Sequence, residues 1–373
     1  MLLRTELFEV HQSHGARLVE FGGWEMPVQY TSIMEEHQMV RTQAGLFDIA
    51  HMGEVAVRGE GAAAFLNQIL TNNIHKLNVG EGQYTLMCND SGGVIDDLYA
   101  YRIDENEYLL IINASRIDVD LAWITTEASR HRGTPLAIED LCATWGAIAL
   151  QGPTSKAFID SCFGAAKTAP STLKKNQITS ATFNNETVYI ARTGYTGEDG
   201  FEIVAPSALL VPLWKKILAQ GAPHGCKPAG LGARDTLRTE VCYPLYGHEL
   251  DETTTPLEAG LGFFVSFDKG GFNGRDTLAA QQAHGVQRRC VAFKMTDKSA
   301  PPRPHYPVWS VGPEAGLVGE VVSGTQSPSL SVGIGMAYVP IALAQAGTKI
   351  EIEIRGRRFA AEVVKKPIYR KAS

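Results

Sequence analysis

The chain has 373 residues, of which 44% are hydrophobic and 20% charged, which is a globular composition too long for one core. Its formal net charge of -6 and pI near 6.0 argue against a general nucleic-acid-binding protein and favour a small-molecule or protein partner. No apolar segment reaches the roughly 20 residues that span a bilayer, and the first residues lack a signal peptide's apolar run, so we expect a cytoplasmic protein.

Alternating apolar and polar residues predict strands at residues 53–58, 108–113, 145–151, 187–192 and 349–354. Helical periods between them predict helices at residues 61–70, 115–130, 206–220 and 232–240. Helices mixed with antiparallel-looking hairpins favour the α+β class over a doubly wound sheet. After Gln282 the chain is rich in Gly, Pro and Val with almost no helical period, which predicts a separate all-β domain.

Three patterns argue against other kinds of site. Residues 59–64 match the dinucleotide fingerprint GxGxxA, but the nearest suitable acid, Glu81, lies in a predicted turn, so a plain turn into a helix is favoured. The six cysteines form no CxxC pair and none lies within a few residues of a histidine, which predicts reduced thiols and no metal site. We expect His51 and His248 to be structural hydrogen-bonding groups.

The first candidate site is a pair of aspartates. A tight turn at residues 89–93 predicts a hairpin whose second strand begins beside them. Strand alternation places Asp96 and Asp97 on opposite faces, so the two carboxylates should be unable to act as a dyad. We expect Asp96 to point inward among apolar neighbours, where a carboxylate needs a partner or a task. The alternative is that both aspartates only brace the hairpin.

The second candidate is the loop at residues 192–202, in which three glycines surround Tyr195 and polar groups. This composition suits either a loop that approaches a flat ligand or an ordinary hairpin turn. In the first case, Glu198 would accept two parallel hydrogen bonds from a ring edge that carries adjacent N–H donors.

The third candidate is Arg234, in the first turn of the helix that follows the glycines at residues 230–232. The helix dipole disfavours a cation there, so the arginine needs a compensating partner. A salt bridge to Asp235 or Glu240 would be one explanation, and a ligand oxygen the other.

Seven segments, in order along nearly the whole chain, resemble the aminomethyltransferase, or T-protein, family of the glycine cleavage system. They are HGAR (14–17), FGGWEMP (21–27), AGLFD (44–48), GGVIDDL (92–98), RTGYTGEDGFE (192–202), GLGARDTLR (230–238) and SGTQSP (323–328). The resemblance implies a three-domain, cloverleaf-like α+β fold around a channel for tetrahydrofolate. The expected domains are roughly residues 1–50 with 140–240, residues 51–139 with 241–282, and a β-barrel-like domain at 283–373.

The resemblance also implies the reaction and its residues. The methylene carbon of an aminomethyl group on lipoylated H-protein passes to tetrahydrofolate, giving 5,10-methylenetetrahydrofolate, ammonia and reduced lipoyl. Asp96 matches the catalytic carboxylate, which would orient the folate amine and stabilise positive charge as ammonia leaves. The expected folate contacts are Tyr84, Tyr101, Tyr195, Glu198, Arg234 and Tyr369. The basic segment at residues 349–373 would face the glutamyl chain of folate or an acidic surface of H-protein, unless it only protects a strand edge.

Two other functions compete within the same fold. Folate-dependent demethylases of small methylated donors share it, but the close match through residues 24–48 favours the aminomethyl branch. A folate-binding iron-sulfur assembly factor would carry a cysteine in a Lys-Gly-Cys-Tyr-like segment, whereas residues 269–276 read KGGFNGRD. The sequence therefore predicts an aminomethyltransferase, with the demethylase as the nearer alternative.

Overall fold

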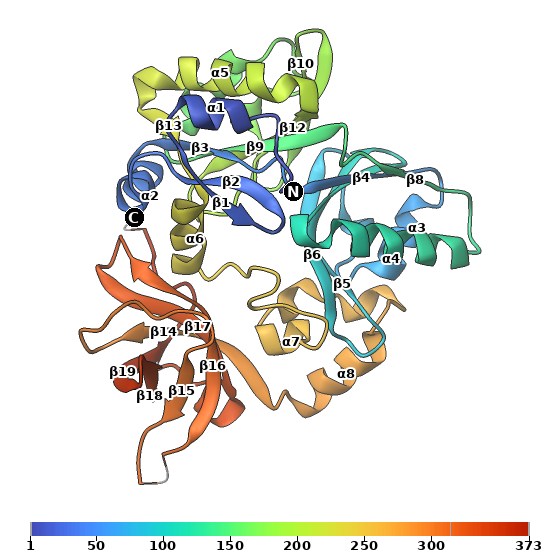
Figure 1. Cartoon of the computed structure of the whole chain (residues 1–373). Coiled ribbons are helices and arrows are strands. Elements are labelled where there is room, and N and C mark those ends of the chain that lie inside the picture. The colour runs from blue at the N-terminus through green and yellow to red at the C-terminus, as the bar shows by residue number, and fades with distance from the viewer. Residues whose placement is uncertain (1, 314, 372–373) are drawn as a thin grey trace. The chain divides into compact units, whose positions relative to one another are not determined.

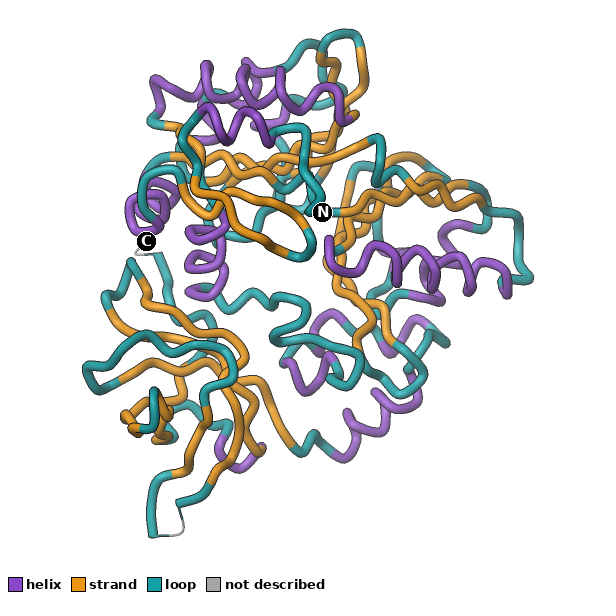
Figure 2. Tube along the Cα trace, in the orientation of Figure 1, coloured by secondary structure: helices purple, strands orange, loops and turns teal. Residues whose placement is uncertain are grey.

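The computed structural model describes residues 2–313 and 315–371 (Figure 1). The chain divides into two units. Unit 1 consists of residues 1–85 and 96–234, and unit 2 of residues 86–95 and 235–373. Both units combine helices with strands, in agreement with the α+β prediction (Figure 2).

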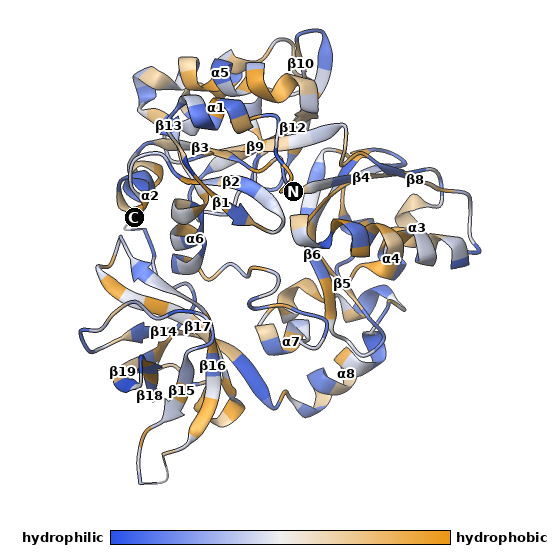
Figure 3. Ribbon diagram, in the orientation of Figure 1, coloured by the Kyte–Doolittle hydropathy of each residue, from blue (hydrophilic) through white to orange (hydrophobic). Residues whose placement is uncertain are grey.

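A six-stranded sheet with helix α5 (Leu210–Gly221) packed against it forms the first part of unit 1 (Figure 1). Its order is β10-β11-β12-β9-β3-β13, and all neighbours are antiparallel except β13 with β3. Apolar residues of α5 recur every three or four positions and bury one face of the helix, so polar and apolar residues alternate along it (Figure 3). The strands are β3 (Ala44–Asp48), β9 (Trp145–Gln151), β10 (Ile178–Phe183), β11 (Glu186–Ala191), β12 (Gly200–Pro206) and β13 (Cys226–Pro228).

A five-stranded sheet of order β5-β6-β7-β4-β8 carries the aspartate pair. Strand β4 pairs antiparallel with both β7 and β8, whereas a dinucleotide site needs a parallel βαβ unit, so residues 59–64 are a turn as predicted. A Cβ at Gly61 would clash with the carbonyl oxygen of Thr134, which explains why glycine is needed there. The elements are β4 (Gly53–Arg58), β5 (Glu81–Cys88), β6 (Val94–Asp104), β7 (Glu107–Ile112), β8 (Ala137–Asp140), α3 (Ala62–Ile69) and α4 (Ile117–Arg130).

The predicted hairpin forms between β5 and β6. The backbone N–H of Asn89 donates to Gly93 O (2.9 Å), and the side-chain oxygen of Asn89 accepts from the Gly93 N–H (3.0 Å). Gly92 has a φ of 79°, which an L-residue rarely adopts. The turn chemistry therefore sets where β6, and with it the aspartate pair, begins.

Smaller elements complete unit 1 and connect it to unit 2. Hairpin β1–β2 precedes helix α2, whose N-cap Ser32 accepts a hydrogen bond from the Glu35 N–H (3.2 Å). Helix α6 contains the boundary between the units, after Arg234. The bounds are α1 (Phe8–Ser13), β1 (Arg17–Phe21), β2 (Trp24–Gln29), α2 (Ile33–Thr42) and α6 (Leu231–Glu240).

A closed antiparallel barrel of order β14-β17-β16-β15-β18-β19 dominates unit 2, which confirms the predicted all-β C-terminal region. Inward-facing aliphatic and aromatic side chains, including Phe293 and Ile352, fill it. The elements of unit 2 are α7 (Pro256–Ala259), α8 (Arg275–His284), β14 (Arg288–Met295), β15 (Pro307–Ser310), β16 (Leu317–Ser327), β17 (Val332–Pro340), β18 (Lys349–Ile354) and β19 (Arg357–Val364).

The three-domain division expected from the sequence stays a prediction. The six-stranded sheet uses residues 44–48 and 145–228, the five-stranded sheet residues 53–140, and the barrel residues 288–364. Each sheet thus draws its strands almost entirely from one expected domain. The outermost positions of those domains, Met1 and residues 372–373, lie outside the described residues.

Two further expectations concern cysteines and membrane segments. All six cysteines are free thiols, and five of them are buried. Among the described residues, no helix has both the length and the apolar character that crossing a bilayer requires.

Glu54 on β4 is a fully buried carboxyl whose two oxygens have no hydrogen-bond partner among the described residues. Burial, and secondarily the charge of Glu6, raise the pKa of Glu54 well above 4.5. The folded state therefore keeps a proton that the unfolded chain releases, so the free energy of unfolding falls as pH rises above about 4.5, by at most about 1.4 kcal/mol per pH unit.

Glu54→Gln should remove this loss, so that the stability of the variant relative to the parent protein increases between pH 5 and pH 8. Urea unfolding at each pH measures the difference. Glu60→Gln, at an exposed position, is the control and should show no such trend. Parallel stability curves for Glu54→Gln and the parent would contradict the prediction.

Candidate functional site

The aspartate pair lies where β6 begins and its neighbour β7 ends. The antiparallel register that pairs Tyr99 with Ile111 places Asn113, the residue after β7, opposite Asp97. Asn113 donates from its backbone N–H to Asp96 Oδ2 (3.0 Å) and from Nδ2 to Asp96 Oδ1 (2.8 Å). The same Nδ2 lies 3.0 Å from Asp97 Oδ1.

One amide nitrogen therefore bridges the two carboxylates. That they cannot act as a dyad stays a prediction. Alternation sends Asp96 and Asp97 to opposite faces of the strand, but it does not restrict a side chain that reaches both from the adjacent strand. Asp96 is 0% exposed, as the inward orientation predicted, whereas Asp97 is partly exposed.

A further carboxyl, Asp120, lies on the buried face of α4. The charge of Asp96 acts on the Asp120 carboxyl and favours its protonated form. Asp120 is 0% exposed, and its oxygens accept no N–H or O–H donor from the described residues. Burial first and the charge of Asp96 second raise the pKa of Asp120 far above its usual range, with Arg116 opposing the shift.

Asp97 lies beside a row of three tyrosines, Tyr84, Tyr99 and Tyr101, which we call the tyrosine row. The Tyr84 hydroxyl donates to Asp97 Oδ2 (2.8 Å), and the Tyr84 ring meets the Tyr99 ring edge-on at 6.2 Å between centroids. Burial, and next the charge of Asp96, raise the pKa of Asp97 to about 7. The Asp97 carboxyl is therefore suited to bind and release a proton near neutral pH.

The tyrosine row continues into a supporting hydrogen-bond chain. Tyr101 stacks on Tyr99 at 5.4 Å between centroids, and its hydroxyl lies 2.9 Å from Thr193 Oγ1. Thr193 in turn donates to Glu202 Oε2 (2.6 Å), which leaves the Tyr101 hydroxyl as the donor to Thr193. Tyr101 is only 1% exposed, so within unit 1 it supports Tyr99 and Thr193 instead of presenting its own surface.

Arg234 lies over the ring of Tyr195, with 4.7 Å from its guanidinium carbon to the ring centroid. Its Nη1 is buried and has no hydrogen-bond partner among the described residues. In the described part of the chain, neither salt bridge considered from the sequence forms: Asp235 pairs with Arg238 (2.7 Å), and Glu240 accepts from serine side chains of unit 2. A buried guanidinium nitrogen without a partner is suited to a ligand oxygen.

His51 departs from its expected structural role. Its Nδ1 is buried and has no hydrogen-bond partner within the described residues, and its ring meets Phe21 edge-on at 5.7 Å between centroids. Burial lowers the pKa of His51 to about 4, with Arg234 adding to this and Asp48 opposing it, so the imidazole is neutral. His248, in contrast, hydrogen-bonds through Nδ1 to the carbonyl oxygen of Val322 (2.8 Å), as predicted.

Glu198 forms a buried ion pair with Arg41 of α2. Arg41 Nη1 donates to Glu198 Oε1 (3.1 Å) and to Thr196 O (2.7 Å), and the two charged side chains are 4% and 3% exposed. This arginine holds the carboxylate in one orientation. The sequence did not reveal Arg41, because nothing in the pattern of α2 distinguishes it from an ordinary helix cation.

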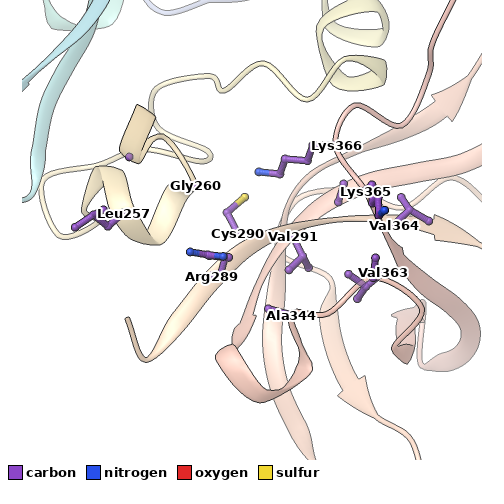
Figure 4. A pocket seen from close by; sticks show the side chains of 13 residues that line it. Leu257, Gly260, Arg289, Cys290, Val291, Ala344, Val363, Val364, Lys365 and Lys366 are labelled. Carbon is purple, nitrogen blue, oxygen red and sulfur yellow. The ribbon is translucent and has the colours of Figure 1, made fainter. Parts of the chain in front are cut away.

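Tyr369, the last predicted folate contact, belongs to unit 2, where its backbone N–H donates to Glu240 O (2.9 Å). Unit 2 also contains a pocket of about 410 Å³ with apolar walls and three cations, Arg289, Lys365 and Lys366. The Lys366 side chain extends toward the thiol of Cys290 there (Figure 4). None of the predicted site residues lines this pocket.

Sequence reasoning also missed Asp120, although a signal for it exists. The buried positions of α4 are Asp120, Ile124 and Glu127, spaced by four and three residues as on an apolar stripe. An aspartate on such a stripe is costly without a partner, which marks it as a candidate for a site.

Taken together, the fold and site define an α+β protein with a C-terminal barrel and a titratable carboxyl beside aromatic rings. They also include an arginine whose buried Nη1 has no hydrogen-bond partner among the described residues. The GCVT N-terminal domain model matches residues 7–269, and the glycine cleavage T-protein C-terminal barrel domain model matches residues 288–370. The chain is 46% identical to an aminomethyltransferase of Geobacillus thermodenitrificans, over 100% of both chains. It is also 46% identical to one of Symbiobacterium thermophilum, over 99% of this chain and 98% of the relative.

The crystal structure of a glycine cleavage system aminomethyltransferase T from Bartonella henselae has a TM-score of 0.90 to this chain. It is 31% identical over 99% of this chain and 98% of the other. The chain belongs to the glycine cleavage T-protein family. These comparisons confirm the resemblance, the fold class and the aminomethyltransferase function that the sequence predicted.

Proposed function

We propose that this chain transfers the methylene carbon of an aminomethyl group on lipoylated H-protein to tetrahydrofolate, which forms 5,10-methylenetetrahydrofolate and releases ammonia. Family membership supports the aminomethyl chemistry. The observation that carries the folate proposal is the buried Arg234 Nη1, which has no partner among the described residues and lies beside the ring of Tyr195. This cation and ring suit a flat ligand that bears a carbonyl or carboxylate oxygen.

The residues of unit 1 fit tetrahydrofolate in composition. Arg234 would bind an oxygen of the folate, and the rings of Tyr84, Tyr99 and Tyr195 would provide flat apolar surfaces. Glu198 would accept hydrogen bonds from the amino and ring N–H groups of the pterin, while its ion pair with Arg41 holds the carboxylate in one orientation. Contacts from Tyr101 and Tyr369 to folate stay predictions.

The aspartate pair would bind and release the protons that move during the reaction. For the atoms to balance, one hydrogen from each of two folate nitrogens must leave, one reaching the lipoyl sulfur and the other the departing ammonia. Asp97 is suited to carry these protons because its carboxyl is partly exposed and its pKa, raised by burial, lies near 7. We therefore propose that Asp97 exchanges the protons and that Asp96, assigned as catalytic from the sequence, supplies the negative charge beside it.

The decisive experiment mixes the purified protein with aminomethylated H-protein and tetrahydrofolate and follows ammonia and methylenetetrahydrofolate together. Equal amounts of both products are expected. Failure with this donor, combined with one-carbon transfer from a small methylated donor, would instead support the demethylase alternative. A cytoplasmic location stays a prediction.

The basic C-terminal segment motivates a prediction about the carrier protein. Arg355, Arg357 and Arg358 are exposed beside the β18–β19 turn, whereas Lys349 is already paired with Glu362 (2.5 Å). If an acidic surface of H-protein docks there, raising salt from about 0.05 to about 0.5 M should lower the rate about tenfold. A small aminomethyl-lipoyl donor is the control and should be insensitive to salt. Equal sensitivity with both donors would contradict the docking hypothesis.

A further inference from the structure

Gln151 is a fully buried amide to which the proposed transfer gives no role. It is the last residue of β9, which lies between β3 and β12 in the six-stranded sheet, and it is paired with Gly200 of β12 (Figure 1). The loop at residues 192–199 leads into β12 at this point. The Gln151 side chain is hydrogen-bonded to this loop, which carries Tyr195 and Glu198.

Both ends of the Gln151 amide have partners. Nε2 donates to Thr193 O (3.0 Å) and to Leu150 O (3.2 Å), and Oε1 accepts from the Thr196 hydroxyl (2.9 Å). Because carbonyl oxygens can only accept, the amide atom that faces Thr193 O and Leu150 O must be the nitrogen. The hydrogen bonds therefore fix the orientation of the amide and attach two loop residues to the end of β9.

The loop backbone packs closely against this amide. A Cβ at Gly194 would overlap the Gln151 side chain, so only glycine allows the backbone to come this near. The two ends of the loop are joined by a bidentate ion pair from Arg192 to Asp199, with N···O distances of 2.9 and 2.6 Å. The ion pair thus closes the loop, and the amide of Gln151 supports its backbone from the sheet.

Thr196 connects the amide to Glu198. The Thr196 hydroxyl, which donates to Gln151, also accepts from the Glu198 backbone N–H (3.2 Å). The Thr196 carbonyl oxygen accepts from Arg41 Nη1 (2.7 Å), and the same nitrogen donates to Glu198 Oε1 (3.1 Å). By fixing Thr196, Gln151 constrains both the backbone and the carboxylate of Glu198.

We propose that Gln151 is a positioning residue that holds Glu198 in the orientation in which the enzyme selects a ring edge with an amino group beside a ring N–H. The inference rests on the proposed contact between Glu198 and the pterin. Gln151 itself touches no substrate, because it acts through Thr196. A carboxylate distinguishes two parallel N–H donors from one only if its orientation is fixed before the ring binds.

Two pairs of variants of the full-length protein test this series of contacts. Gln151→Met keeps the length of the buried side chain but removes its hydrogen bonds, and Gln12→Met, at an exposed position, is its control. Thr196→Val removes the hydroxyl with little change in size, whereas Thr196→Ser restores a hydroxyl. Only Gln151→Met and Thr196→Val break the connection to Glu198.

The first measurement compares the affinities for tetrahydrofolate and for its 2-desamino analogue, which lacks the ring amino group. Calorimetry should show that the parent protein prefers tetrahydrofolate by about 10²-fold, and that Gln151→Met and Thr196→Val each reduce this preference about tenfold. Thr196→Ser should recover the preference, and Gln12→Met should equal the parent. An unchanged preference in both Gln151→Met and Thr196→Val would overturn the proposal.

Kinetics and a double variant separate positioning from a general structural role. At saturating tetrahydrofolate, single-turnover transfer in Gln151→Met should stay within about twofold of the parent rate, because only ring recognition is lost. The double variant of Gln151→Met with Thr196→Val should reduce the preference no further than either single variant, since both remove the same contact. Additive losses would contradict a shared path through Thr196.

The second measurement is amide hydrogen exchange in the protein without ligands, followed by NMR. The Glu198 N–H, which donates to Thr196, should exchange about tenfold faster in Gln151→Met and Thr196→Val, while amides of the barrel strands keep the parent rates. Unchanged exchange of the Glu198 N–H in both variants would overturn the positioning role.

This second measurement also keeps the inference separate from the proposed function. If the parent protein fails to bind tetrahydrofolate, the proposed function is wrong, whereas the exchange rates still decide whether Gln151 positions Glu198. If Gln151→Met does not fold, the comparison of Thr196→Val with Thr196→Ser decides the question in the same way.

Discussion

Asp97→Asn should lower the rate of methylene transfer by about 10²-fold to 10⁴-fold, because asparagine cannot bind or release the transferred proton. In the parent protein the Tyr84 hydroxyl donates to Asp97 Oδ2 (2.8 Å). Asparagine keeps the size of the side chain and an oxygen that can accept this hydrogen bond. Tetrahydrofolate affinity should therefore change little. Single-turnover assays give the rate, and fluorescence titration with folate gives the affinity.

Asp96→Asn is the matched comparison, because it removes the adjacent carboxylate from the same strand. It should cost less than Asp97→Asn and should move the acidic limb of the pH profile to lower pH, since the charge that raises the pKa of Asp97 after burial is gone. If Asp96→Asn is inactive while Asp97→Asn keeps its activity, Asp96 is the proton-exchanging group and the assignment based on the tyrosine row fails.

Arg234→Met should weaken tetrahydrofolate binding by about 10²-fold, because it removes the buried cation proposed to bind a folate oxygen. Methionine preserves much of the length of the side chain and its packing against Tyr195. Isothermal titration calorimetry measures the loss directly. Arg289→Met, at an exposed cation in unit 2, is the control and should leave folate affinity unchanged.

Stability distinguishes ligand binding from a structural role for Arg234. A buried charged nitrogen without a partner costs free energy, so the ligand-free Arg234→Met variant should be as stable as the parent or more stable. Urea unfolding without folate tests this. A large loss of stability, together with unchanged folate affinity, would show that Arg234 supports the fold and would remove the main support for the folate proposal.

Local sequence patterns determined the secondary structure around the site. The glycine turn at residues 89–93 specified where β6 begins, and alternation along β6 correctly turned Asp96 inward. Helical periodicity located α4 and α5, and the loss of that periodicity after Gln282 indicated the barrel. These features depend on neighbours within a few residues, which is why the sequence alone could predict them.

Tertiary structure decided how the candidate groups are paired. Asn113 bridges the two aspartates from the adjacent strand, the charge of Asp96 acts on Asp120 of a later helix, and Arg41 holds Glu198 from 157 positions away. Likewise, Asp235 pairs with Arg238 and not with Arg234, whose Nη1 therefore has no hydrogen-bond partner among the described residues. Protonation depends on burial and on charges brought together by folding, and neither spacing nor alternation specifies those distances.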